Sequence, residues 1–267
     1  MELIKETDFL RLSLETRIDP KKELQKPPVA LSIGEYDYRG RMYPIPFGSY
    51  GDFSCLVGAS KTYKTFLKTA LIAGYIGGKS NNYFESIKGH ETAEKYILDI
   101  DTEQSEFHAH RASRRVMEMV GSDYEFYKPY SLRRLEPKIR YDFIEWLVYE
   151  SNYRDKIGLI TVDGAADLVN DVNDLKESNR VAQAFMKWTQ DANCHLITVL
   201  HKSYGVNKPT GHLGSAILKK AETVAFLEKD SIGITVTPEY TRNYPFEEFR
   251  FEIKNNLPFH ANEHGVY

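Results

Sequence analysis

Eight consecutive residues of this 267-residue chain have the types and spacing that bind phosphate groups. They match the pattern G-x-x-x-x-G-K-[ST], in which backbone amides surround a phosphate and a lysine reaches it, except that tyrosine replaces the second glycine. Glycine at that position allows a positive φ and a close approach to phosphate, and a Cβ opposes both. The sequence therefore predicts a phosphate-binding loop with one unusual position, formed by Gly58, Ala59, Ser60, Lys61, Thr62, Tyr63, Lys64 and Thr65.

The segments on both sides of this loop have the patterns that such a loop needs. Residues 53–57 are a short apolar run typical of a strand, and residues 65–73 repeat apolar residues at helical spacing. The helix would direct its positive end at a phosphate, Lys64 would reach the β- and γ-phosphates, and the Thr65 hydroxyl would bind Mg²⁺. An ordinary turn with a chance Lys-Thr pair is the alternative. Lys61 fits either a further phosphate contact or a solvated side chain.

Two acidic residues follow apolar segments at positions where parallel strands bind ligands. Residues 157–162 are a strand-like run that ends before Asp163, which could hold Mg²⁺ through water. Residues 96–101 lead to Glu103, which could orient or deprotonate an attacking water. The alternative for Glu103 is structural, because Thr102 and Glu103 also suit the N-terminus of the following helix.

The rest of the chain alternates apolar strands with amphipathic helices. This alternation predicts an α/β fold with a mainly parallel sheet flanked by helices. After Glu222 the apolar runs come closer together, which predicts antiparallel strands at the C-terminal end. Strands are expected at 53–57, 93–101, 124–130, 156–162, 195–200, 223–227, 233–236 and 246–253, and helices at 65–73, 106–120, 134–151 and 175–192.

Length and composition limit the domain organisation and the compartment. Residues 1–28 are charged and interrupted by prolines, so we expect an N-terminal arm or linker followed by one domain over residues 29–267. The net charge of -3 and the pI of about 6.3 give no overall basic signal, so nucleic-acid binding would depend on local patches. Cys55 and Cys194 lie in apolar runs and are expected to be buried free thiols. Without a signal peptide or an apolar stretch long enough to span a bilayer, we expect a cytoplasmic protein with no membrane partner.

The order of these motifs resembles the RecA-fold P-loop ATPases, and within them the RepA-like and DnaB-like replicative helicases, including relatives on mobile genetic elements. The resemblance extends over about residues 29–257. It implies a RecA-like core that binds ATP and Mg²⁺. It also implies that Lys64 and Thr65 are the lysine and the hydroxyl of the Walker A loop.

The same resemblance assigns roles to three further residues. Glu103 matches the catalytic glutamate after the second strand, and Asp163 matches the Walker B aspartate. His201 falls where the family has a polar sensor of the γ-phosphate, although a histidine at a strand end is otherwise more often structural. These residues follow the loop in the order that the family requires.

The chain departs from the family pattern at two arginines. RepA-like members have an arginine before Gly-Ser where this chain has Leu213, and a DnaB-like Lys-x-Arg pair corresponds to residues 240–242, which keep only Arg242. Arg242 is therefore the candidate for an arginine finger that acts across a subunit boundary and neutralises charge on the transferred phosphoryl group. An exposed strand arginine is the alternative. Lys219 and Lys220 could substitute for it or be surface charges.

The resemblance further implies a homo-oligomer, such as a ring, that contacts single-stranded DNA. The basic and aromatic segment 202–212 lies where the family has a loop that grips the strand by charge and stacking. An ordinary surface loop would have much the same composition. Arg111 could sense nucleotide or a neighbouring subunit, with a solvated helix face as the alternative.

Three functions are consistent with these features. The first is an oligomeric, Mg²⁺-dependent ATPase that acts on DNA as a helicase, loader or mobilisation or replication factor. The second is a nucleotide-gated switch, in which Tyr63 and Leu213 allow ATP binding but slow its hydrolysis. The third is a P-loop kinase, which the C-terminal strands and Glu103 fit less well.

Overall fold

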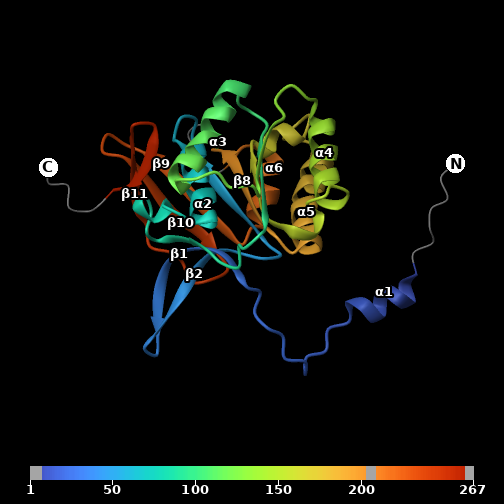
Figure 1. Cartoon of the computed structure of the whole chain (residues 1–267). Coiled ribbons are helices and arrows are strands. Elements are labelled where there is room, and N and C mark those ends of the chain that lie inside the picture. The colour runs from blue at the N-terminus through green and yellow to red at the C-terminus, as the bar shows by residue number, and fades with distance from the viewer. Residues whose placement is uncertain (1–7, 203–208, 262–267) are drawn as a thin grey trace.

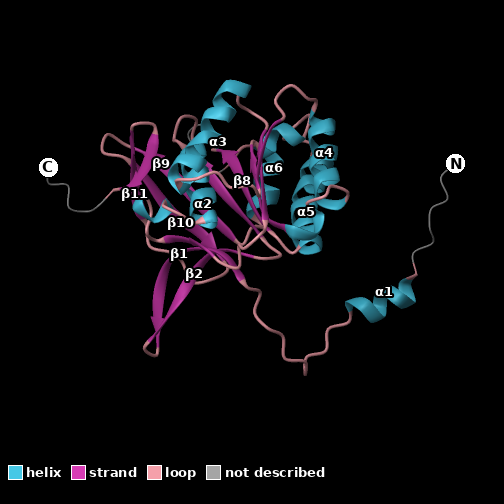
Figure 2. Cartoon of the chain, viewed as in Figure 1, coloured by secondary structure: helices cyan, strands magenta, loops and turns pink. Residues whose placement is uncertain are grey.

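One large mixed sheet forms the centre of the molecule (Figures 1 and 2). In the computed structural model, which describes residues 8–202 and 209–261, nine strands follow the order β12-β11-β10-β9-β3-β8-β7-β5-β6. The strands that pair in parallel are β3 (Phe53–Gly58), β5 (Tyr96–Asp101), β6 (Tyr127–Ser131), β7 (Ile157–Asp163), β8 (His195–His201) and β9 (Thr223–Lys229). The antiparallel strands at one edge are β10 (Ile234–Thr241), β11 (Phe249–Lys254) and β12 (Leu257–His260).

Helices cover both faces of this sheet (Figure 1). On one face Leu67 and Val116 pack with Leu56 of β3, and on the other Val181 and Leu213 pack with Val57, the next residue of the same strand. This alternation is what a strand buried on both sides requires. The helices of the first face are α2 (Lys64–Ile76) and α3 (Glu106–Val120), and those of the second are α4 (Pro137–Tyr149), α5 (Leu175–Ala192) and α6 (Gly211–Leu218). Short 3₁₀ helices lie at Ser80–Asn82, Arg154–Lys156 and Ala165–Leu168.

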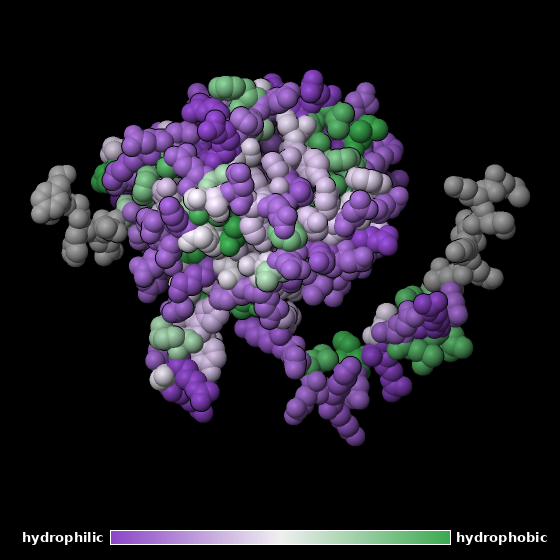
Figure 3. Space-filling model, viewed as in Figure 1, coloured by the Kyte–Doolittle hydropathy of each residue, from purple (hydrophilic) through white to green (hydrophobic). Residues whose placement is uncertain are grey.

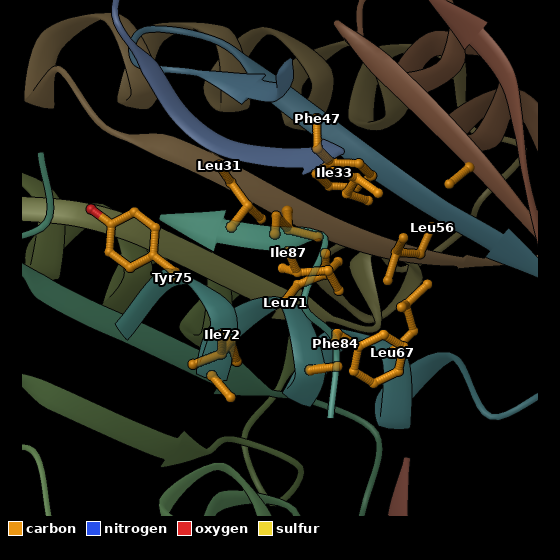
Figure 4. Close-up of a cluster of buried hydrophobic side chains, with 14 of the residues drawn as sticks. Leu31, Ile33, Phe47, Leu56, Leu67, Leu71, Ile72, Tyr75, Phe84 and Ile87 are labelled. Atoms are coloured by element: carbon orange, nitrogen blue, oxygen red, sulfur yellow. The ribbon is translucent and has the colours of Figure 1, made fainter. Parts of the chain in front are cut away.

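A small antiparallel sheet packs against α2 on the first face. Its strands are β1 (Val29–Tyr38), β2 (Arg41–Ser49) and β4 (Ile87–Gly89), in the order β2-β1-β4. Leu31, Phe47 and Ile87 from these strands lie in one buried cluster with Leu71 of α2 and Leu56 of β3 (Figure 4). This sheet therefore contacts both α2 and the large sheet and helps to hold α2 in place.

A helix that contacts none of this core precedes the small sheet. Helix α1 (Phe9–Thr16) begins after Asp8, whose side chain accepts a hydrogen bond from the Arg11 amide at 3.0 Å. None of its residues is buried, and Figure 3 shows its hydrophobic side chains set apart from the main body. This helix lies within the segment that we expected to be an arm or linker. None of the helices among the described residues is long and apolar enough to cross a membrane.

The sequence predicted the fold class correctly but not every element. The bounds of α3 and α5 are as expected, whereas α4 starts at Pro137 instead of residue 134 because Glu136 is extended, as residues before proline tend to be. Strand β9 was expected to pair antiparallel, but it also pairs in parallel with β3 because α6 forms the crossover from β8. Helix α6 was not predicted, since its short segment includes Gly211 and Gly214. The paired strands β1 and β2 were also missed, and register irregularities along them weaken the alternation that identifies a strand.

A buried histidine at the amino end of β8 gives the fold a pH dependence. Burial lowers the pKa of His195, against the opposing effect of Glu222, and Nδ1 donates a hydrogen bond to the Ser49 carbonyl at 3.0 Å. Because the folded-state pKa is lower than the unfolded-state value of about 6.5, this contribution to stability is present above that pH and is lost as the pH falls below it.

We therefore expect His195→Asn to reduce the acid sensitivity of folding. The asparagine amide nitrogen occupies the place of Nδ1 and can still donate to Ser49 but takes up no proton, so the free energy of unfolding should fall less between pH 6.5 and 5 than in the wild type. The difference in slope is limited to one proton, about 1.4 kcal/mol per pH unit. Urea unfolding at pH 7.5, 6.5 and 5 measures it, and equal slopes would contradict the assignment of a neutral buried imidazole.

Candidate active site

The candidate residues meet at the carboxyl ends of four neighbouring parallel strands. Gly58 at the end of β3 pairs with His201 at the end of β8, and Asp163 at the end of β7 pairs with Asp101 at the end of β5. Because β3, β8, β7 and β5 are adjacent and parallel, these ends lie along one edge of the sheet, where α/β proteins bind ligands. Glu103 follows Asp101 at the same edge. The structure thus brings together the loop and both acidic residues that the sequence singled out.

The first residue of the loop must be glycine. A Cβ on Gly58 would lie 2.6 Å from Thr62 Oγ1 and 2.9 Å from the Leu227 carbonyl oxygen. Thr62 Oγ1 in turn donates a hydrogen bond to the Ala59 carbonyl at 2.8 Å, across the loop. The loop therefore closes on itself against β9.

Tyr63 adopts the left-handed conformation that the missing glycine would have taken. Its φ of 61° and ψ of 29° place it immediately before the first residue of α2. Its ring packs edge-on against Phe66, with centroids 5.3 Å apart, and Lys229 Nζ lies 4.7 Å from its centroid. A left-handed residue with a Cβ costs roughly 1–2 kcal/mol, and these two contacts offset part of that cost. The Cβ of Tyr63 thus does not prevent the positive φ expected of glycine at this position. The backbone is strained there, and the side-chain contacts offset part of the cost.

Two substitutions at this position separate backbone conformation from side-chain chemistry. Tyr63→Gly should leave the affinity for ADP within about threefold, because glycine enters the left-handed region without strain. Tyr63→Val should weaken it about tenfold, because a β-branched residue is a strong outlier there and the loop would have to regain this conformation on binding. Titration of a fluorescent ADP analogue measures both, and equal affinities of the two variants would contradict a conformational role.

Lys64 lies inside the loop at the start of α2. Its Nζ donates hydrogen bonds to the Gly58 and Ala59 carbonyls at 2.9 and 2.8 Å, and lies 3.3 Å from His201 Nδ1. Burial lowers the pKa of Lys64, and the nearby carboxylates of Asp163 and Glu103 oppose that shift. Charge-assisted bonds to phosphate are stronger than those to neutral carbonyls, so the ammonium can exchange these partners for a phosphate. Among the described residues no side chain caps the N-terminus of α2, which fits an anion at that position.

Thr65 and Asp163 form the candidate magnesium ligands. Thr65 Oγ1 donates a hydrogen bond to Asp163 Oδ2 at 2.9 Å, so the two oxygens already lie side by side. Hard oxygen ligands of this kind suit Mg²⁺, which keeps several waters and takes the rest of its ligands from phosphates. Within residues 8–202 and 209–261, no group of three or more histidine, cysteine or acidic side chains is placed to hold a metal ion. The pair therefore fits a cation that phosphate and water help to hold.

Glu103 and His201 form a second pair at the same edge. His201 Nε2 lies 3.1 Å from Glu103 Oε2, and this hydrogen bond lowers the pKa of Glu103 against the opposing effect of burial. The turn that presents Glu103 is held by Asp101, which accepts from the Glu103 and Gln104 amides at 3.1 and 2.7 Å. Burial raises the pKa of Asp101 to about 6. Glu103 is therefore an ionised acceptor on a fixed turn, as a base or a water-orienting residue must be.

The sequence analysis missed a buried ionic network next to this pair. Lys68 Nζ of α2 lies 2.9 Å from Asp99 Oδ1 and 3.3 Å from Asp163 Oδ2. Burial lowers the pKa of Lys68, but the carboxylates of Asp99, Asp163 and Asp101 outweigh this effect and the net shift is upward. Asp99 also accepts hydrogen bonds from Tyr127 Oη at 2.6 Å and Thr161 Oγ1 at 2.5 Å. A lysine on the buried face of an otherwise apolar helix was the signal in the sequence.

A cavity of about 510 Å³ opens between the loop and the β11–β12 turn. Arg115 of α3 lies 3.7 Å from the Phe66 ring centroid and donates to the Asn256 carbonyl at 2.8 Å. Arg111, for which the sequence left open a nucleotide sensor or a solvated helix face, is exposed at the cavity and donates to Asn256 Oδ1 at 3.0 Å. Asn256 follows Asn255, and both have positive φ, which favours a tight turn between the strands. The sequence did not indicate that this C-terminal turn contacts α3.

Arg242 and Leu213 lie away from this cavity. Arg242 follows β10, whose last residue Thr241 pairs with the first residue of β9, so it sits at the opposite end of the sheet. There it contacts Asp52 Oδ2 at 3.1 Å and the Lys220 carbonyl at 2.8 Å, and its side chain is 55% exposed. Leu213 is fully buried in the core. Of the expected DNA loop 202–212, residues 203–208 lie outside the described residues, and residues 211–212 form the first turn of α6 instead of a loop.

The central parallel sheet, the Gly58–Thr65 loop before α2 and the acidic strand ends define a P-loop ATPase domain. The chain belongs to the AAA domain family, whose family model matches residues 45–205, more than half of the chain. This match covers the loop, Glu103, Asp163 and His201. No curated protein matches the chain.

Proposed function

We propose that this P-loop protein is an Mg²⁺-dependent ATP hydrolase of the RecA/RepA-like class. The observation that supports this most directly is the convergence of Lys64, Thr65, Asp163, Glu103 and His201 at one sheet edge beside the 510 Å³ cavity. A phosphate cradle, a pair of hard oxygen ligands and an ionised carboxylate are the parts that phosphoryl transfer to water needs.

The loop and Lys64 would hold the phosphates of the nucleotide. The amides at the start of α2 direct partial positive charge at them, and Lys64 would exchange its bonds with the Gly58 and Ala59 carbonyls for bonds with phosphate oxygens. Thr65 and Asp163 would hold Mg²⁺, which neutralises charge on the phosphates when it is bound. The chain itself thus supplies one buried cation, one hydroxyl and one carboxylate for this task.

Glu103 would act on the attacking water. Its carboxylate is ionised and accepts hydrogen bonds, so it can orient a water and take up its proton. His201 lies between Glu103 and Lys64, at 3.1 and 3.3 Å. A γ-phosphate held by Lys64 would therefore contact the same imidazole that positions Glu103, which would couple occupancy of the site to the position of the base.

Action on DNA by an oligomer belongs to the same proposal. Exposed Arg242 lies at the opposite end of the sheet from Lys64, so it could reach a phosphate only in a neighbouring copy. The segment 202–212 follows His201 directly. Single-stranded DNA bound to this segment would therefore influence the nucleotide site through His201. The basic and aromatic composition of the loop suits a single-stranded polynucleotide.

One experiment tests the proposal and separates its parts. ATP turnover is measured with and without single-stranded DNA, for the wild type and Lys64→Ala, and the size of the oligomer is measured in the same samples. We expect turnover that DNA stimulates and that Lys64→Ala loses. Folded wild-type protein that binds ATP tightly but shows negligible turnover under every condition would contradict a DNA-stimulated hydrolase.

The second candidate is a nucleotide-gated switch with little or no hydrolysis. The strained conformation of Tyr63 favours it, because a loop that stores strain can be biased by its ligand. Single-turnover phosphate release decides between the candidates. A rate no faster than that of Glu103→Gln would favour the switch.

A further inference from the structure

A fully buried lysine lies beneath the phosphate-binding loop. Lys68 is one helical turn after Lys64 on α2, and its side chain is 1% exposed. Its ammonium bridges two carboxylate oxygens, Asp99 Oδ1 at 2.9 Å and Asp163 Oδ2 at 3.3 Å. One partner is the candidate magnesium ligand, and the other has no role in the proposed chemistry.

Asp99 fixes this lysine with respect to the sheet. Its carboxylate accepts hydrogen bonds from Tyr127 of β6 and Thr161 of β7, at 2.6 and 2.5 Å, so three neighbouring strands hold it in one position. Because Lys68 is held by Asp99, it also holds Asp163, whose Oδ2 lies next to the ammonium. The same Oδ2 atom accepts a hydrogen bond from Thr65. The magnesium ligand is therefore oriented by two residues of α2.

Around Lys68 the buried carboxylates outnumber the ammonium group that bridges them. Asp99, Asp101 and Asp163 face α2 from adjacent strands, and all three are buried. Lys68 is the cation that bridges two of them, in the manner of a divalent cation between oxygen ligands. A metal ion that approaches Asp163 must therefore overcome the repulsion of a fixed ammonium unless phosphates add negative charge.

We propose that Lys68 is a positioning residue that serves as the resident counter-ion of Asp99 and Asp163, so that a divalent cation binds tightly at Asp163 only together with nucleotide phosphates. This role rests on the nucleotide site proposed above. This role makes cation binding depend on nucleotide binding. The ammonium of Lys68 offsets negative charge of the carboxylates, and the phosphates add the negative charge that the cation needs. It also keeps the acidic strand ends folded when no nucleotide is bound.

A charge series tests this role in the nucleotide-free protein. Lys68→Met removes a positive charge, Asp99→Asn removes a negative charge, and the double variant restores the original net charge. Mn²⁺ binding, measured by electron paramagnetic resonance, should be at least about tenfold tighter in Lys68→Met than in the wild type and about tenfold weaker in Asp99→Asn. The double variant should lie within about threefold of the wild type.

A purely structural role of Lys68 would not produce this order. A structural role would weaken Mn²⁺ binding equally in all three variants, or change their stability without changing their affinity for Mn²⁺. An order independent of charge, or tight Mn²⁺ binding by the nucleotide-free wild type, would overturn the proposal. If Lys68→Met does not fold, tighter binding by the double variant than by Asp99→Asn still tests the same order.

Thermal unfolding provides an independent readout. Lys68→Met leaves the Asp99 carboxylate buried without its cation, so its Tm should fall, and Mg²⁺ without nucleotide should restore part of the loss. Mg²⁺ should not shift the Tm of the wild type or of Lys176→Met, an exposed control on α5. Absence of ADP binding by the wild type would refute the proposed function, whereas loss of the charge order would refute the role of Lys68.

Discussion

Replacing Lys64 with alanine should remove most of the ATP turnover while leaving the protein folded. The ammonium donates to Gly58 and Ala59 within its own loop and contacts His201, so its removal takes the main side-chain cation from the phosphate site and little from the core. Charge-assisted hydrogen bonds contribute about 1.5–3 kcal/mol, which corresponds to roughly 10–100-fold weaker nucleotide binding. The loss of a group that stabilises the transition state should lower turnover by about 100-fold or more.

Titration of ATP and phosphate release under saturating ATP separate these two effects. Lys176→Ala is a suitable control, because Lys176 is exposed on α5, which covers the other face of the sheet. Circular dichroism and the Tm should show that Lys64→Ala remains folded. A folded Lys64→Ala protein with wild-type affinity and turnover would exclude the loop as the phosphate site.

Glu103→Gln should separate binding from hydrolysis. Glutamine keeps the size of the side chain and an oxygen that can contact His201, but it cannot accept a proton from water. Loss of a general base slows the chemical step by about 10²–10⁴-fold, whereas the affinity for ATP should stay within about threefold. The variant should therefore hold ATP without consuming it.

Single-turnover phosphate release and equilibrium ATP binding measure these quantities for Glu103→Gln. Glu106→Gln is the matched control, because Glu106 is exposed in the first turn of α3 and pairs with Arg134 outside the cavity. Hydrolysis at the wild-type rate in Glu103→Gln would assign the base to another residue. An equal loss in Glu106→Gln would indicate a general effect on α3.

The sequence predicted the site best where motif and strand end are adjacent in the chain. The loop, Asp163 and Glu103 each follow an apolar strand, so the direction of the strand places them at one edge without any knowledge of tertiary contacts. The conformation of Tyr63 could not be predicted in this way, because packing by Phe66 and Lys229 supports a left-handed residue there. The preference of tyrosine against a left-handed conformation is overcome by side-chain contacts that form only in the folded chain.

The parts of the site that the sequence did not reveal depend on contacts between distant segments. Lys68 meets Asp99 across the interface between α2 and the sheet, and Asn256 meets Arg115 from the C-terminal turn. No spacing rule connects such pairs. The expected arginine finger illustrates the same limit, since the fold places Arg242 at the far end of the sheet, away from Lys64 of its own chain.

A structure of the protein with Mg²⁺ and a non-hydrolysable ATP analogue tests the central claim most directly. We predict that the phosphates lie against the Gly58–Thr65 loop, that Lys64 Nζ has exchanged the Gly58 and Ala59 carbonyls for phosphate oxygens, and that Mg²⁺ lies beside Thr65 and Asp163. Nucleotide bound elsewhere, or a loop that excludes the analogue at saturating concentration, would contradict the account.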